Sequence, residues 1–275
     1  AGYRVAFAKK TRDAAREGVL TAVRADRFDE VQPAQTVPLA PPPVSCEDHD
    51  DMPSVGSVAL ILRLRCRRAR RRLTVANTHL YYASGALALR TAQTRRLLEA
   101  VFFDDGDSSS TENPIGPPRG EGGVIVCGDL NAFPTSAAVE LLRTGRLRRS
   151  SSSASFSFEA RRTSEEEEEE EESRDFPPLA SAYELDQLAP TAHRVAAHES
   201  HTCAYKYTHV VPGFAAALDY IFTDPTALHA GRTLPIPDLA EYWGAECPSD
   251  HVLLAADLAW VDDVEGGRSP GRKGR

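Results

Sequence analysis

An unbroken apolar run, Val124 to Cys127, leads directly into Gly128, Asp129 and Asn131. A strand that is apolar at every position must be covered on both faces, as in a sheet packed between other layers. This run therefore constrains the fold more than any other stretch and favours a layered α/β domain. The carboxylate and the amide behind it fit either an ordinary turn, because Asx side chains bond their own backbone, or a metal-assisted active site.

The rest of the chain alternates between strand and helix patterns. Apolar residues recur at helical spacing over residues 86–103, and Ser136 is a plausible N-cap for a helix that ends near Arg143. Strands are predicted at Val19–Val23, Phe28–Gln32, Val55–Arg65, Leu73–His79, Val124–Cys127, Leu218–Phe222 and Leu253–Trp260. The alternation predicts one α/β domain over residues 1–262.

Three polar segments interrupt this pattern. Residues 33–53 and 104–122 are predicted to be loops, whereas residues 149–177 and the basic tail 263–275 are predicted to be disordered. The net charge is −8, and the octaglutamate run Glu165–Glu172 alone contributes eight negative charges. The acidic balance therefore belongs to one tract and does not argue against a polyanionic substrate.

The cysteine pattern points to reduced thiols. Five cysteines are an odd number, they have no CxxC spacing, and Cys127 lies inside the apolar run. We therefore expect an intracellular protein without a disulfide framework. No apolar stretch approaches the length that spans a bilayer, so we expect no membrane partner.

Four short segments share one arrangement, in which an apolar stretch meets polar, metal- or phosphate-seeking residues. Taken singly, each has an ordinary explanation as a turn, a cap or a hydrogen-bonded histidine. Asp219 is harder to dismiss, because burying an unpaired carboxylate costs several kcal/mol and a histidine is its natural partner. The segments are Asn77-Thr78-His79, Gly128-Asp129-Leu130-Asn131, Leu218-Asp219-Tyr220-Ile221-Phe222 and Ser249-Asp250-His251.

The order of these segments resembles the endonuclease/exonuclease/phosphatase superfamily. The deadenylase branch, and its 2′,5′-oligoadenylate phosphodiesterase group in particular, is similar in further stretches. These are His79-Leu80-Tyr81-Tyr82 with Arg90 and Gln93, Ser181-Ala182-Tyr183, Tyr207-Thr208, and Gly213-Phe214. The resemblance implies a four-layer α/β sandwich of the DNase I-like type. It also implies hydrolysis of oligo- or poly(A) RNA, linked 2′,5′ or 3′,5′, to 5′-nucleotides.

The resemblance implies a Mg²⁺ cofactor, with Mn²⁺ as a possible substitute, on the side of Asp129, Asn131 and Asp250. Asp129 would activate or orient the attacking water. His251 would contact the scissile phosphate, with Asp219 holding its tautomer and favouring its charged form.

Three residues are implied on the substrate side. His79 would make a second phosphate contact, and Asn131 would donate to a phosphate oxygen without adding negative charge. Phe214 matches the position at which relatives stack a base, although a core aromatic is an equally good interpretation of that residue. The polymer bound there would be RNA.

The sequence departs from the family in one respect that bears on activity. The family carries a metal-binding glutamate in a Gln-Glu-Val strand end, and no Gln-Glu dipeptide occurs in this chain. We therefore expect an N-terminally incomplete domain with little or no Mg²⁺-dependent activity as it stands. The alternative is a non-catalytic fragment of the same fold that binds RNA or protein. The relatives leave a mitochondrial or a cytoplasmic location open.

Overall fold

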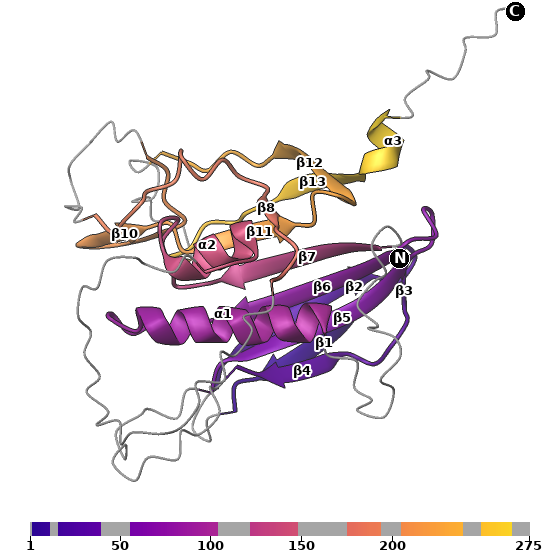
Figure 1. Cartoon of the computed structure of the whole chain (residues 1–275), viewed down its shortest axis with the longest axis horizontal. Helices are drawn as coiled ribbons and strands as arrows, with labels where there is room; N and C mark the ends of the chain where they lie inside the picture. Colours follow the sequence, from indigo (N-terminus) through magenta and orange to yellow (C-terminus); the bar gives the residue numbers. More distant parts are fainter. Residues whose placement is uncertain are drawn as a thin grey trace, which may run out of the picture.

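The computed structural model describes residues 2–11, 16–39, 56–103, 122–147, 175–193, 205–238 and 249–265. The predicted insertions and tail fall largely outside these residues, at 40–53, 104–121, 149–174 and 266–275. The described elements build an α/β structure around one central sheet, as the sequence pattern predicts (Figure 1).

Among the described residues, the central sheet has seven strands. Strands β6 and β7 run parallel, and the other neighbours in this sheet pair antiparallel. Both β3 and β4 pair with β5, along different parts of that strand. The strands across the sheet are β3 (Phe28–Glu30), β5 (Val58–Cys66), β6 (Arg72–His79), β7 (Gly122–Asp129), β11 (Asp219–Thr223) and β8 (Ala180–Ser181), with β4 (Gln35–Pro38) beside β5.

Two helices cover one face of this sheet. They are α1 (Leu87–Phe102) and α2 (Ala137–Thr144), and their apolar sides pack with Ala59 and Ile61 of β5 in the larger core cluster (Figure 1). The Ser136 hydroxyl accepts a hydrogen bond from the amide of Val139, which confirms the predicted N-cap. The predicted helix at 86–103 is confirmed within one residue at each end.

Two antiparallel strand pairs cover the opposite face of the sheet. They pair β1 (Tyr3–Lys9) with β2 (Gly18–Arg24), and β12 (Leu228–Thr233) with β13 (Ala256–Trp260). Leu60, Leu62 and Leu64 of β5 point into this second cluster, as the two-residue period of a strand requires. A short helix, α3 (Val261–Glu265), follows β13, and a small hairpin joins β9 (His209–Val211) to β10 (Phe214–Ala216). The described residues thus form one helical layer and two sheet layers, which are three of the four layers expected for the sandwich.

Several predicted boundaries were wrong. Strand β4 lies inside the predicted loop 33–53, because Val37 is an apolar residue buried against the helices. Phe176 belongs to the core rather than to a disordered insertion, since its ring packs on Phe103. Helix α3 extends into the predicted tail, to Glu265. The strands predicted at Val19–Val23 and Phe28–Gln32 lie in different sheets, because β2 pairs with β1 and β3 pairs with β5.

The β1–β2 hairpin exposes an apolar face. Tyr3, Val5 and Phe7 of β1 are each more than half exposed, as is Leu20 of β2. A contiguous apolar surface of this kind favours self-association. Among the described residues, no helix is both long and apolar enough to cross a membrane.

Candidate active site

Three neighbouring strands of the central sheet end in polar side chains that lie side by side. His79 closes β6 opposite Asp129, which closes β7, and Asp129 in turn faces Asp219 at the start of β11. The His79 Nε2 atom lies 3.5 Å from Oδ2 of Asp129. The pairing register of the sheet therefore gathers three of the predicted groups at one edge.

The turn after β7 explains the glycine in the sequence Gly128-Asp129-Leu130-Asn131. Gly128 has a φ of 132°, and a Cβ there would lie 1.9 Å from the carbonyl oxygen of Thr78. Asn131, with a φ of 48°, donates its backbone amide to Oδ1 of Asp129 over 2.8 Å. Its side-chain nitrogen donates to the Leu80 carbonyl over 3.0 Å. The segment is both a turn and part of the site, because the turn fixes the Asp129 carboxylate.

Replacing Gly128 by alanine should destabilise the protein strongly, because the new Cβ meets the Thr78 backbone and the φ angle strains any other residue. We expect a loss of at least about 2–3 kcal/mol in the free energy of unfolding. Gly213→Ala is the matched control: its φ is 86°, but no heavy atom lies within 4 Å of a Cβ at that position. Urea denaturation of both variants measures the difference, and equal losses would contradict a steric role for Gly128.

His251 reaches the same edge from a loop. Its Nδ1 is 2.8 Å from Oδ2 of Asp219, and its Nε2 is 3.9 Å from Oδ2 of Asp129. The loop is held by backbone hydrogen bonds from Val252 to Thr208 and from Val210 to Asp250. The Thr208 hydroxyl also accepts the amide of Asp219 over 3.0 Å. Threonine 208 thus positions both members of the Asp219–His251 pair.

The surroundings of the clustered side chains shift their pKa values in different directions. Burial, reinforced by the charge of Asp219, raises the pKa of Asp129 from 3.8 to about 6. The hydrogen bond that Asp219 accepts from His251 raises the pKa of His251, which favours the imidazolium. Burial lowers the pKa of His79, with the nearby Lys10 charge acting in the same direction. The same site therefore holds a carboxyl whose pKa is raised to about 6 and an imidazole whose pKa is shifted toward the charged form.

Comparison with known families gives this geometry its context. The model of the endonuclease/exonuclease/phosphatase family matches residues 86–251, more than half of the chain. The chain belongs to this family. The superfamily expected from the four segments is therefore confirmed, and the matched region contains Asp129, Asn131, Asp219 and His251.

Individual relatives of the chain come from the branch that the sequence resembles. The 2′,5′-phosphodiesterase 12 of Mus musculus is 28% identical over 196 residues, which cover 69% of this chain and 26% of that protein. The Homo sapiens protein of the same name is 27% identical over the same length. The chain thus spans about a quarter of these curated relatives.

Solved structures show the same fold. The human Nocturnin catalytic domain superposes with a TM-score of 0.56 at 21% identity, covering 94% of this chain and 73% of that one. ANGEL2, a 2′,3′-cyclic phosphatase in complex with adenosine-2′,3′-vanadate, superposes with a TM-score of 0.60 at 20% identity, covering 94% and 74%. These likenesses confirm the DNase I-like α/β fold of this family.

The described site fits the divalent cation that this family generally uses. One ligand atom each from Asp129, Asp219 and His251 lies within 4.8 Å of the others. Burial and, after it, the charge of Asp219 make it costly to ionise Asp129, and they raise its pKa to about 6. A hard cation held by one or two carboxylates would offset that cost.

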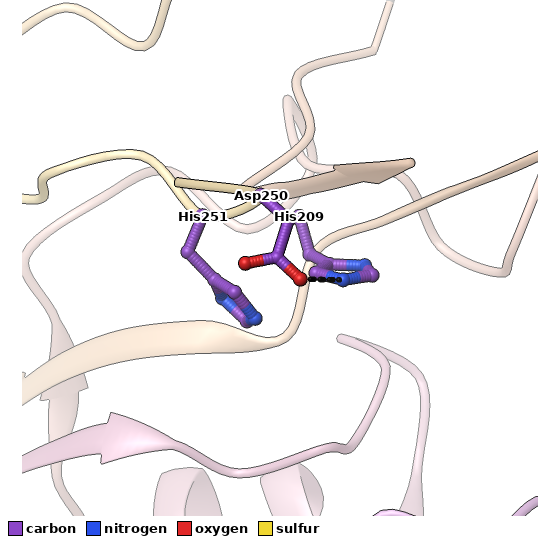
Figure 2. A group of neighbouring side chains, drawn as sticks. All are labelled: His209, Asp250 and His251. Carbon is purple, nitrogen blue, oxygen red and sulfur yellow. Dashed lines mark ion pairs between the residues drawn. The ribbon is translucent and has the colours of Figure 1, made fainter. Parts of the chain in front are cut away.

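Two predicted residues lie beside this cluster rather than in it. Asp250 is 56% exposed on its side chain, and its Oδ2 lies 3.3 Å from Nε2 of His209 (Figure 2). Phe214 packs its ring edge-on to His209, with ring centroids 5.5 Å apart. The structure therefore groups Asp250 with His209 and His251, and not with Asp129 and Asn131.

Sequence reasoning missed Lys10. It follows β1, its ammonium pairs with Glu17, and its charge acts on both His79 and Asp129. A lysine that follows another lysine at a strand end carries no signal of its own, so only the position of the hairpin reveals it.

Arg90 and Gln93 were noticed in the sequence only through their similarity to the family. They are buried and bond the backbone of Tyr81, the second residue after His79.

Proposed function

We propose that this chain carries the catalytic site of a Mg²⁺-dependent phosphodiesterase that hydrolyses oligo- or poly(A) RNA to 5′-nucleotides, with Mn²⁺ as an alternative cofactor. The observation that carries the proposal is the meeting of His79, Asp129, Asp219 and His251 at one sheet edge. Imidazole and carboxylate groups of this kind suit charge stabilisation and proton transfer at a phosphodiester. The similarity to the 2′,5′-phosphodiesterase 12 proteins supports the substrate class.

In this mechanism water attacks the scissile phosphorus and Asp129 accepts its proton. The Asp129 carboxylate suits that role by position, because the Asn131 amide fixes it at the end of β7, beside His79 and His251. The bond to the 2′- or 3′-oxygen breaks, and that oxygen takes a proton from solvent. A bound Mg²⁺ would supply charge neutralisation at the phosphate.

His251 serves as the phosphate donor. Asp219 holds its Nδ1 over 2.8 Å, so the Nε2–H of the imidazolium is left to face the cluster. His79 provides a second contact, and the neutral form that burial favours can donate one hydrogen bond. Asn131 already bonds Leu80 through its amide nitrogen, so in this conformation it shapes the Asp129 turn. Phe214 would stack a base, a contact that contributes about 1–3 kcal/mol.

The deciding experiment measures turnover on both linkage isomers. The 275-residue chain and the full-length product of its gene are incubated with 2′,5′- and 3′,5′-linked oligoadenylates in Mg²⁺, Mn²⁺ or EDTA. We expect metal-dependent release of 5′-AMP by the full-length product, with the preferred linkage read from the relative rates. Absence of metal-dependent release on both isomers would overturn the proposal. Retained oligoadenylate binding without release would favour the alternative, a binding module of the same fold.

A further inference from the structure

A second group of metal-binding side chains lies against the proposed catalytic site. In Figure 2 the Asp250 carboxylate points to the His209 ring, and the His251 ring lies beside them. One ligand atom of each residue lies within 4.8 Å of the others. The His209 Nε2 to Asp250 Oδ2 separation is 3.3 Å. Two ligands of a tetrahedral zinc at its usual bond lengths are also about 3.3 Å apart.

The backbone holds this group in place. His209 and His251 form an isolated antiparallel bridge. Hydrogen bonds of 2.9 Å from Val210 to Asp250 and from Val252 to Thr208 flank that bridge. The ring centroids of the two histidines are 4.4 Å apart. Little rearrangement is therefore needed to bring both imidazoles and the carboxylate onto one ion.

The chemistry of the group differs from that of a magnesium site. Two imidazoles and one carboxylate suit zinc and similar borderline ions, whereas Mg²⁺ prefers oxygen ligands. His251 has the support typical of a metal-bound histidine, because Asp219 accepts its Nδ1–H and leaves Nε2 for an ion. His209 lacks such support, since its Nδ1 is buried without a hydrogen-bond partner among the described residues. An exchangeable site with an open fourth position is expected from this donor set.

We propose that His209, Asp250 and His251 form a Zn²⁺ site that shares His251 with the Asp129–Asp219 group and withdraws His251 from the phosphate. His251 is shared between the two groups of ligands, so it cannot ligate zinc and donate to a phosphate through Nε2 at once. The binding part of this inference stands alone. The inhibitory part rests on the proposed phosphodiesterase function.

The test of binding uses Zn²⁺ by calorimetry and Co²⁺ by its visible absorption, both without substrate. We compare the unmodified chain with His209→Asn, and with His229→Asn as the control, because His229 is an exposed histidine on β12. We expect His209→Asn to lose one zinc equivalent or to weaken it at least about tenfold, since losing even an outer partner of a ligand costs that much. His229→Asn should match the unmodified chain.

The second arm measures 5′-AMP release in Mg²⁺ by the form of the protein that shows hydrolysis, while Zn²⁺ is titrated. Zinc should inhibit the unmodified protein, and a chelator should restore its rate. His209→Asn should keep its rate in Mg²⁺ and resist zinc at least about tenfold better. Identical zinc binding by His209→Asn and the unmodified chain would overturn the proposal, as would equal zinc sensitivity. Thermal melts of each variant exclude a folding defect as the cause. Failure of the phosphodiesterase proposal leaves the binding arm intact.

Discussion

Replacing His251 by glutamine should reduce the rate of oligoadenylate hydrolysis by about 10²–10⁴-fold, the usual effect of losing a group that donates to developing charge. Glutamine keeps a donor of similar length but cannot carry the positive charge that Asp219 favours on the imidazole. The measurement is single-turnover release of 5′-AMP at saturating Mg²⁺ by the form of the protein that shows hydrolysis.

His229→Gln is the matched control for this experiment, because it makes the same chemical change on an exposed strand position. It should leave the rate unchanged. Asp219→Asn tests the partner: it keeps the geometry of the 2.8 Å contact but removes the charge that holds the imidazolium. We expect an intermediate loss of rate. A His251→Gln variant with an unchanged rate would remove His251 from the site.

The convergence of the site could be predicted because it follows from sheet geometry. His79 and Asp129 both end strands, and the ends of two parallel strands that pair in register lie at the same edge. The need of Asp219 for a cationic partner was likewise visible from its apolar neighbours, and His251 supplies that partner. The polar residues at the strand ends were therefore sufficient to predict that these groups meet at one edge of the sheet.

The remaining features depend on contacts between segments that no local pattern encodes. Lys10 acts on Asp129 only because the β1–β2 hairpin packs on β6, where Asn77 bonds the Leu20 carbonyl. His209 lies beside Asp250 because it forms an isolated β-bridge with His251, which is distant in the sequence. Phe176 sits at the end of a low-complexity stretch, so its composition indicated disorder although its ring lies in the core.

The buried charge of Asp129 should destabilise the folded protein when no metal is bound. The Asp129→Asn variant should therefore have a higher free energy of unfolding in the metal-free form. Burial and the Asp219 charge raise the pKa of Asp129 from 3.8 to about 6. Below pH 3.8 the carboxyl is protonated in both the folded and the unfolded state and imposes no penalty. As the pH rises toward about 6, the unfolded state ionises first, so the folded state loses stability relative to it. Asparagine has no charge to bury.

We therefore expect Asp129→Asn to raise the free energy of unfolding in EDTA by up to about 3 kcal/mol at pH 7, because each pKa unit corresponds to about 1.4 kcal/mol. The gain should vanish near pH 4, and hydrolysis should fall by about 10²-fold or more at every pH. Denaturant titrations of both proteins at a series of pH values measure the difference in the free energy of unfolding. A gain that is the same at pH 4 and pH 7 would show that the stabilisation comes from the amide's hydrogen bonds and not from the removed charge.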